Sequence, residues 1–257
     1  MAPHLLSDTA ALTGRMLRHI TRSLDTIITT AVMPIAMMLL FVYVLGGAID
    51  TRQGDGGGTY IDYLLPGILL ITVASGISYT TFRLFADLQS GIFDRFNTMP
   101  IARSAILWSH VITSMVANLV SLLVVMAVAL IIGFRSPAGL GAWLAVAGML
   151  ALLTLALTWV AVIPGLTAKG ADGALVYSYP LIFLPFISSA FVPTGSMPGP
   201  VRWFAEHQPS TPIIDAIRSL WAAQPVGNDI WTAVAWCAGI LVAAFVTAMA
   251  AYHRRIG

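Results

Sequence analysis

The sequence predicts an all-α integral membrane protein with six transmembrane helices. Its 257 residues are 58% hydrophobic and only 9% charged, whereas soluble proteins carry about 25% charged residues. The apolar residues fall into six segments, each near the length of about 20 residues that crosses a bilayer. Three further helical elements complete the expected fold: an N-terminal amphipathic interfacial helix, a short cytoplasmic helix and an outer re-entrant helical hairpin.

The N-terminal segment has the pattern of an amphipathic helix. Over residues 7–24, apolar side chains recur along one stripe and basic side chains lie opposite: Leu12, Met16, Ile20 and Leu24 against Arg15, Arg18, His19 and Arg22. This arrangement is typical of a helix that lies on an anionic leaflet. We therefore predict that residues 1–25 form a cytoplasmic interfacial helix. The alternative is a polar lead-in to the first span.

The rest of the chain, residues 26–257, is expected to form one six-span transmembrane domain. The predicted spans are 26–47, 62–83, 105–132, 141–164, 174–192 and 229–251. Long stretches of these segments contain no Asp, Glu, Lys or Arg, as a hydrocarbon environment requires.

The basic residues predict the orientation. If the N-terminus is inside, nine Lys and Arg residues lie at cytoplasmic ends: Arg15, Arg18, Arg22, Arg83, Arg95, Arg103, Lys169, Arg254 and Arg255. Four then lie outside: Arg52, Arg135, Arg202 and Arg218. This excess satisfies the positive-inside rule. Both termini are therefore expected in the cytoplasm.

Residues 87–103, DLQSGIFDRFNTMPIAR, form a polar island between the second and third spans. Helical spacing over about 87–99 separates an apolar side from a polar one: Ile92, Phe93, Phe96 and Met99 against Asp94, Arg95 and Asn97. Gly91 and Pro100 can bracket a helix of about two turns. An ordinary loop is the alternative, but a loop has no need of two phenylalanines in water. We therefore expect a partner to cover them.

The outer connections differ in character. Residues 50–59 contain QGDGGG and predict a flexible loop. The connection over about residues 193–226 is longer and more apolar. It contains two short helical patterns, Val201–Ala205 and Ile213–Trp221. In the second pattern, Thr211 is expected as N-cap with Pro212 at the first helical position. We predict two half-helices that dip into the outer leaflet and pack against protein; the alternative is an ordinary extracellular loop.

The fifth predicted span contains Pro180 and Pro185. Each proline removes a backbone hydrogen bond, so we expect a kinked helix. The span is also rich in aromatic residues, namely Tyr177, Tyr179, Phe183 and Phe186. Aromatic residues in a span more often pack against protein or face lipid. The two prolines and the four aromatic residues are nevertheless the candidates for a substrate path.

The sequence lacks the residues that several kinds of chemistry need. The only lysine, Lys169, does not belong to a G-x-x-x-x-G-K-[ST] phosphate-binding loop, so any nucleotide energy must come from another chain. The span cores contain no acidic or basic residue of the kind that ion-coupled transport uses. His110 is expected to be an interfacial polar residue. No Cys/His pair has metal-ligand spacing, and a net charge of +2 does not indicate nucleic-acid binding.

Three stretches together resemble the membrane subunit of a type-2 ATP-binding cassette exporter, specifically the daunorubicin-resistance permease family of actinobacteria. They are YLLPGILL (63–70), GIFDRFNTMPIARSAIL (91–107) and SSAFVPTGSMPGPVRWFAEHQPSTPIIDAIRSL (188–220). Gly91, Arg95, Pro100 and Arg103 fit the family's pattern around its coupling helix. The chain departs from the pattern at Met99 and Gln208, where leucine and asparagine are usual, so a substrate cannot be transferred from the family.

The resemblance implies a permease in a bacterial plasma membrane, paired with a second permease, the same or homologous, and two copies of a cassette ATPase. It makes 87–99 the coupling helix, with Gly91, Phe93, Asp94, Arg95, Phe96, Asn97, Pro100 and Arg103 as coupling residues. This chain would hold no cofactor and would not itself be an enzyme, because ATP and Mg would bind to the ATPase. The expected cargo is a hydrophobic or amphipathic drug or lipid. The alternative is an ion-coupled carrier or pore-forming subunit without ATPase.

Overall fold

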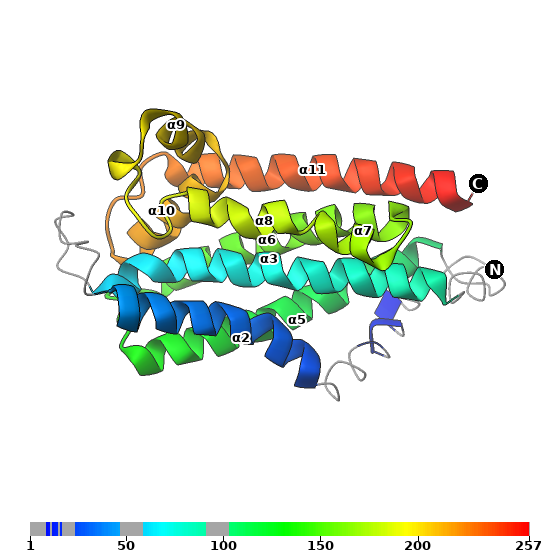
Figure 1. The fold of residues 1–257 in the computed structure, drawn as a ribbon, viewed down its shortest axis with the longest axis horizontal. Coiled ribbons are helices and arrows are strands. Elements are labelled where there is room, and N and C mark those ends of the chain that lie inside the picture. The colour runs from blue at the N-terminus through cyan, green and yellow to red at the C-terminus, as the bar shows by residue number, and fades with distance from the viewer. Residues whose placement is uncertain are drawn as a thin grey trace.

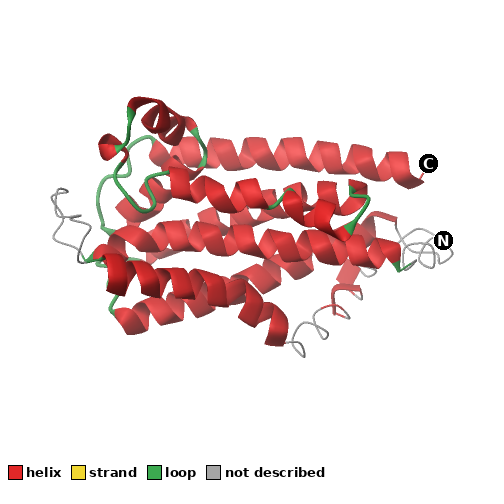
Figure 2. Cartoon of the chain, in the orientation of Figure 1, coloured by secondary structure: helices red, strands yellow, loops and turns green. Residues whose placement is uncertain are grey.

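A computed structural model describes residues 9–10, 12–14, 16, 24–46, 59–90 and 103–256 of the chain. These residues form helices and connecting loops, and no strand occurs among them (Figures 1 and 2). The α-helices are α2 (Leu24–Leu40), α3 (Tyr60–Gln89), α5 (Arg103–Ile132), α6 (Leu140–Thr167), α7 (Ala171–Val176), α8 (Tyr179–Phe183), α9 (Gly199–His207), α10 (Ser210–Trp221) and α11 (Asp229–Ile256). A π-helical turn η1 (Phe41–Leu45) and the 3₁₀ turns η2 (Leu184–Ile187) and η3 (Thr194–Ser196) complete the set.

Four described helices are long and apolar enough to cross a membrane: Tyr60–Gln89, Ala105–Ile132, Leu140–Thr167 and Asp229–Arg254. They correspond to the second, third, fourth and sixth predicted spans, which are thereby confirmed as long apolar helices. The first and fifth predicted spans correspond to shorter apolar helical stretches, Thr30–Val44 and Ala171–Ile187. The membrane protein class is therefore supported, while the count of six spans stays a prediction.

Helix α3 is the centre of the bundle. It contacts α2, α5, α6, α7, α8 and α10, so helices distant in the sequence lie along it (Figure 1). Two glycines of α3 permit close approach: a Cβ on Gly67 would lie 2.5 Å from Ala190 Cβ, and one on Gly76 would lie 2.1 Å from Asn118 Oδ1. Small residues at helix crossings are typical of membrane bundles, where close packing replaces the hydrophobic drive of water.

Aromatic clusters close the core at both ends of the bundle. Near the outer hairpin, the Phe134 ring lies 5.1 Å from that of Trp221, and Trp143 lies 5.4 Å from Trp221. Toward the other end, Trp159 packs edge-on against Trp108 at 5.3 Å and against Phe245 at 4.7 Å. Edge-to-face pairs of this kind stabilise beyond the area that they bury.

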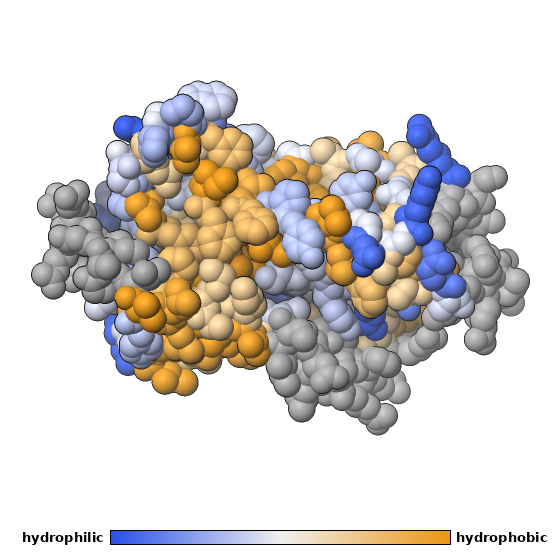
Figure 3. Space-filling model, viewed as in Figure 1, coloured by the Kyte–Doolittle hydropathy of each residue, from blue (hydrophilic) through white to orange (hydrophobic). Residues whose placement is uncertain are grey.

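The outer surface of the bundle is strongly apolar. Exposed large hydrophobic residues line several long helices, including Met33 at 60%, Leu123 at 60%, Leu144 at 64% and Val242 at 64%. Figure 3 shows a broad hydrophobic area across the middle, with hydrophilic residues toward the end that holds the C-terminus. A surface of this extent is unfavourable in water and suits a hydrocarbon environment.

The fifth predicted span is broken rather than simply kinked. Helix α7 ends at Val176, α8 begins at Tyr179, and a 3₁₀ turn follows from Leu184. Each proline lies in the first turn of a new segment, Pro180 in α8 and Pro185 in η2. The first turn of a helix needs no intrahelical N–H donor, so proline is tolerated there. The prediction located the disturbance correctly but underestimated its extent.

The predicted outer hairpin contains two helices, α9 and α10, as expected. Its cap assignment was wrong, because α10 begins at Ser210, with Pro209 at the N-cap position and no side-chain cap. The Thr211 hydroxyl instead donates to the Ala205 carbonyl and ties α10 to α9. Ile213, Ile217 and Trp221 of α10 are buried, and Leu220 is half-buried.

The described part of the N-terminal segment is helical and rests on the bundle. Leu12 packs against the core cluster that contains Trp159, and the Thr113 hydroxyl lies 3.7 Å from the Met16 sulfur. Two residues of the predicted apolar stripe therefore face protein. The rest of the stripe, Ile20 and the Leu24 side chain, and the whole basic side lie outside the described residues.

Candidate functional site: a polar pocket and an outer clamp

Most of the predicted coupling residues lie outside the part of the chain that the structure describes. This applies to Gly91, Phe93, Asp94, Arg95, Phe96, Asn97 and Pro100, and Arg103 is placed only as the first residue of α5. The beginning of the predicted coupling helix needs correction. Residues 87–89 form the last turn of α3, which ends at Gln89 with Ser90 as its C-cap. Any separate helix therefore begins later than residue 87.

The six candidate substrate-path residues divide into two groups. Tyr177, Tyr179 and Phe183 are 64%, 54% and 60% exposed, and Pro180 is also exposed. Pro185 is buried, and the Phe186 ring stacks 5.0 Å from that of Phe191, which in turn stacks 4.6 Å from Phe41. The structure thus does not gather the six into one site.

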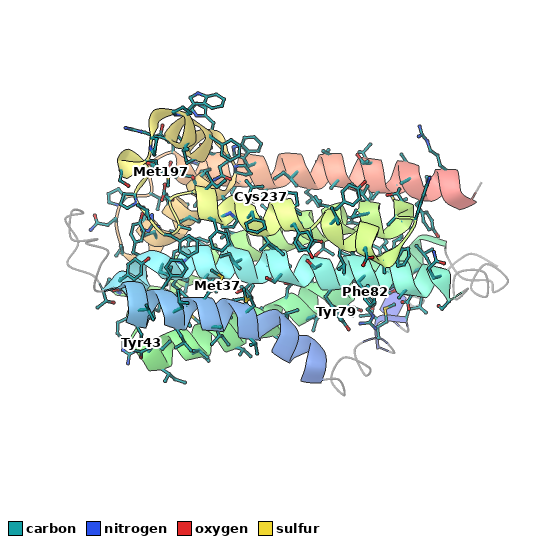
Figure 4. The ribbon with its side chains drawn as sticks, viewed as in Figure 1. Met37, Tyr43, Tyr79, Phe82, Met197 and Cys237 are labelled. Atoms are coloured by element: carbon teal, nitrogen blue, oxygen red, sulfur yellow. The ribbon has the colours of Figure 1, made fainter. Side chains whose placement is uncertain are left out.

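A polar pocket lies between α2, α3 and α5. We call this the inner pocket; its lining residues are Thr30, Gly76, Tyr79, Thr80, Arg83, His110, Thr113, Ser114, Ala117, Asn118 and Ser121. Tyr79 is labelled on α3 in Figure 4. Hydroxyl groups join the helices, with Thr80 Oγ1 2.6 Å from Ser114 Oγ and Thr30 Oγ1 2.9 Å from Ser121 Oγ. Such hydrogen bonds help hold helices together in lipid.

Not all polar atoms around the inner pocket have hydrogen-bond partners. Asn118 and His110 are each 3% exposed, and Asn118 Oδ1, His110 Nε2 and Arg83 Nη1 are buried without a hydrogen bond to any described residue. His110 Nε2 does lie 3.3 Å from Asp87 Oδ2, although the two are not aligned as a hydrogen bond. Burying a polar group without a partner costs free energy. The pocket is therefore suited to hold a hydrogen-bonding group.

The inner pocket was not predicted. His110, expected as an interfacial polar residue, lines this pocket with its ring enclosed in protein. A signal was present in the sequence. On α5 the polar residues His110, Ser114, Asn118 and Ser121 recur at intervals of three or four, which places them on one helix face. The stripe contains no Asp, Glu, Lys or Arg, so a search of the spans for those four residue types passes over it.

A second polar cluster, which we call the outer clamp, consists of Tyr63, Ser189, Asp215 and Arg218. Arg218 Nη1 donates to Asp215 Oδ1 at 2.7 Å, and Arg218 Nη2 donates to the carbonyls of Ser189 at 2.7 Å and Tyr63 at 3.1 Å. The guanidinium also stacks 3.8 Å from the centre of the Tyr63 ring, and the Ser189 hydroxyl donates to Asp215 at 2.7 Å.

The outer clamp joins three parts of the chain. It ties α10 to the beginning of α3 and to the segment that follows η2. Burial raises the pKa of Asp215, and the positive charge of Arg218 and the hydrogen bond from Ser189 oppose this rise. The clamp therefore fixes the end of the broken fifth span to the central helix.

Comparison with known proteins identifies the family. The ABC-2 type transporter model matches residues 7–221. The chain is 28% identical over 226 residues to the daunorubicin resistance ABC transporter permease protein DrrB1 of Streptomyces coeruleorubidus, covering 85% of this chain and 76% of that protein. It is also 28% identical over 253 residues to the probable doxorubicin resistance ABC transporter permease protein DrrC of Mycobacterium tuberculosis, covering 97% and 89%. The chain therefore belongs to the ABC-2 type transporter family.

Proposed function

We propose that this chain is the transmembrane subunit of an ATP-driven exporter that moves a hydrophobic or amphipathic compound, a drug or a lipid, out of the cell. The observation that carries the proposal is the family match over residues 7–221. The names of the two relatives, which refer to daunorubicin and doxorubicin resistance, favour amphipathic cargo.

The energy source in this proposal is a separate cassette ATPase. The full sequence contains no phosphate-binding loop of the Walker type. The partner, in two copies, would bind ATP and Mg, and this chain would contribute no catalytic residue. A second permease, the same or homologous, would complete the transporter in the plasma membrane. Both termini and the loop after α3 would then face the cytoplasm, as the positive-inside rule favours.

Coupling to the ATPase is assigned to the stretch between α3 and α5. In this proposal Phe93 and Phe96 fill a groove on the ATPase, Arg95 pairs with an acidic residue there, and Gly91, Pro100 and Arg103 frame the helix. Asp94 and Asn97 complete its polar side. The helices α3 and α5, which this stretch joins, line the inner pocket, so movement of the stretch would act directly on the centre of the bundle.

The cargo path is proposed along the broken fifth span. Tyr177, Tyr179, Pro180 and Phe183 are exposed on it, whereas Pro185 and Phe186 anchor its far end. Short segments separated by prolines can change their relative angle without unwinding a long helix. This gives the span the freedom that a moving wall of the path would need.

The test is co-purification of the ATPase with the double variant Phe93→Ala/Phe96→Ala. Truncating anchor residues of an interface costs about 2 kcal/mol or more each, so we expect retention of the ATPase to fall more than about tenfold. Arg95→Glu should reduce retention more than Arg95→Ala, because a like charge would then face the acidic partner. The variants should insert normally, since the spans do not depend on this stretch.

A matched control removes two aromatic rings elsewhere. Trp203 and Phe204 on α9 are 64% and 44% exposed, so Trp203→Ala/Phe204→Ala removes similar area in the outer hairpin. The control should retain the ATPase fully. Undiminished retention and normal stimulated ATPase activity in Phe93→Ala/Phe96→Ala would refute the coupling role. If no cassette subunit stimulates or binds the wild-type chain, the exporter function itself is refuted.

A further inference from the structure

We propose that the inner pocket binds an oxyanion, the phosphate or carboxylate head of an amphiphile, with Arg83 as its cationic anchor. This site requires only that the bundle lies in a membrane. It does not depend on ATP-driven export, so the two proposals can fail separately.

The anchor is a guanidinium with a buried nitrogen that has no acceptor among the described residues. Arg83 is half-buried on α3 and lines the inner pocket, and the nitrogen in question is its Nη1 atom. The contrast with Arg218 is informative, because that arginine satisfies its nitrogens with one carboxylate and two carbonyls. A buried guanidinium nitrogen requires an acceptor, and phosphate and carboxylate oxygens fit it best.

The walls of the pocket complement a negative group. Hydroxyl groups of Tyr79, Thr80, Thr113 and Ser114 line it, although Thr80 already donates to the Gly76 carbonyl and Thr113 to the Met16 sulfur. No carboxylate is among the described lining residues. The nearest acid in sequence is Asp87, one turn beyond Arg83, and its carboxylate lies beside His110. The pocket therefore offers a polar lining without carboxylates and one cation, Arg83, to a ligand oxygen.

The size of the pocket limits how much of the ligand enters. Its cavity of about 10 Å³ has room for a single water-sized group. One oxygen of a head group can therefore reach Arg83 Nη1, while the remainder of the head group stays at the mouth. Arg83 lies six residues before the end of α3, toward the end of the bundle that holds the C-terminus (Figure 1). Head groups of one leaflet lie at that depth.

The surface beside the pocket suits an acyl or other apolar tail. Phe82, which adjoins Arg83, is 42% exposed, and Val116 and Leu119 on α5 are 37% and 55% exposed. These apolar side chains face outward from the same two helices that line the pocket. A ligand with both a polar head and an apolar tail matches this surface better than a free ion does.

The experiment measures lipid binding to the purified full chain by native mass spectrometry. Phosphatidylglycerol is titrated against diacylglycerol with identical acyl chains, which has the same tails but no oxyanion. Hydrogen bonds to charged groups contribute about 1.5–3 kcal/mol, so Arg83→Gln should weaken the saturable phosphatidylglycerol site about tenfold or more. Arg254→Gln is the matched control, because Arg254 is an exposed arginine at the same end of the bundle. The affinity of this variant for phosphatidylglycerol should equal that of wild type.

Two further arms complete the test. Asp87→Asn removes a negative charge near the bound anion and should tighten phosphatidylglycerol binding, which keeps the site testable if Arg83→Gln does not fold. Displacement of the lipid by millimolar inorganic phosphate would identify a free oxyanion as the ligand; resistance to displacement would identify the lipid. Wild-type affinity in Arg83→Gln, unchanged affinity in Asp87→Asn, or equal binding of diacylglycerol would each overturn the site.

Discussion

The outer clamp and the inner pocket are both polar clusters within an apolar bundle, but they are completed to different degrees. In the clamp, Arg218, Asp215 and Ser189 exchange hydrogen bonds of 2.7 Å. In the pocket, Arg83, His110 and Asn118 each bury a polar atom that has no hydrogen bond within the described chain. A completed cluster holds elements in place, and an incomplete one retains the capacity to bind. The comparison therefore assigns anchoring to the outer end and ligand binding to the inner end.

The difference follows from the cost of isolated polar groups in a low-dielectric environment. A paired guanidinium offsets its desolvation through the partner, whereas an unpaired one does not. Because the membrane interior supplies little water, an incomplete cluster persists only where something else compensates. Mutations should therefore be costly at the clamp and, where they only remove an unpaired atom, mild at the pocket.

The largest expected effect is at the clamp. Arg218→Met would leave the carbonyls of Tyr63 and Ser189 without the guanidinium donor and Asp215 with only the Ser189 hydroxyl, and breaking a buried pair costs about 3 kcal/mol or more. Because the Asp215 side chain is 33% exposed, we expect the free energy of unfolding to fall by about 2–3 kcal/mol. Denaturant titration in detergent micelles measures this change.

The control for the clamp is the exposed ion pair on α9. Arg202 and Glu206 lie 2.7 Å apart, with side chains 52% and 38% exposed, and such pairs contribute at most about 0.5 kcal/mol. Arg202→Met should therefore change stability little. Equal losses in Arg218→Met and Arg202→Met would remove the distinction between a structural clamp and an ordinary surface pair.

A smaller effect is expected where α3 crosses α5 at the inner pocket. In Gly76→Ala the new methyl group would meet the Asn118 amide, which must shift, and overpacking of this kind costs about 1–3 kcal/mol. At Gly148 on α6 and Gly239 on α11, an added methyl group would meet no described neighbour within 4 Å. Alanine at either position should be neutral or slightly stabilising.

The loss of stability at the crossing of α3 and α5 is measured by thermal unfolding of Gly76→Ala, Gly148→Ala and the double variant Gly76→Ala/Asn118→Ser. The shorter serine side chain should restore part of the loss, because it withdraws from the new methyl group. If the double variant loses as much as the sum of its single variants, the glycine does not act through Asn118, and the close crossing is not what shapes the pocket.

The smallest expected effect is a pH dependence of the clamp. Burial raises the pKa of Asp215 above the ordinary carboxyl value of 3.8, so the folded protein holds this proton more tightly than the unfolded chain does. The contribution of Asp215 to stability should therefore decrease as pH rises from 3.8 through the raised pKa. Arg218→Met should raise that pKa further and steepen the decrease. Measuring the free energy of unfolding as a function of pH in wild type and in Asp215→Asn isolates the effect. Identical slopes of this free energy against pH in the two proteins would contradict it.

Sequence alone was sufficient for the class and for most helices. The scarcity of charge identified a membrane protein, and the four long helices begin within two residues of their predicted starts, as for α5 at Arg103–Ile132 against 105–132, although α3 runs six residues past its predicted end at residue 83. The prolines located the break in the fifth span because proline acts on its own backbone, whatever surrounds it. The coupling stretch around Phe93 and Phe96 remains a prediction, since it lies outside the described residues.

Only the tertiary structure decided which polar side chains meet. The inner pocket depends on Thr30 and Ser121, 91 residues apart, and the outer clamp on Tyr63 and Arg218, 155 residues apart. In a soluble protein the apolar face of a helix indicates which side packs inward, but in a membrane the lipid-facing side is equally apolar, so periodicity says little about helix partners. Close crossings such as Gly76 against Asn118 set the pairing of the helices. That pairing supplied Arg218 with its partners and left Arg83 Nη1 without a hydrogen bond to any described residue.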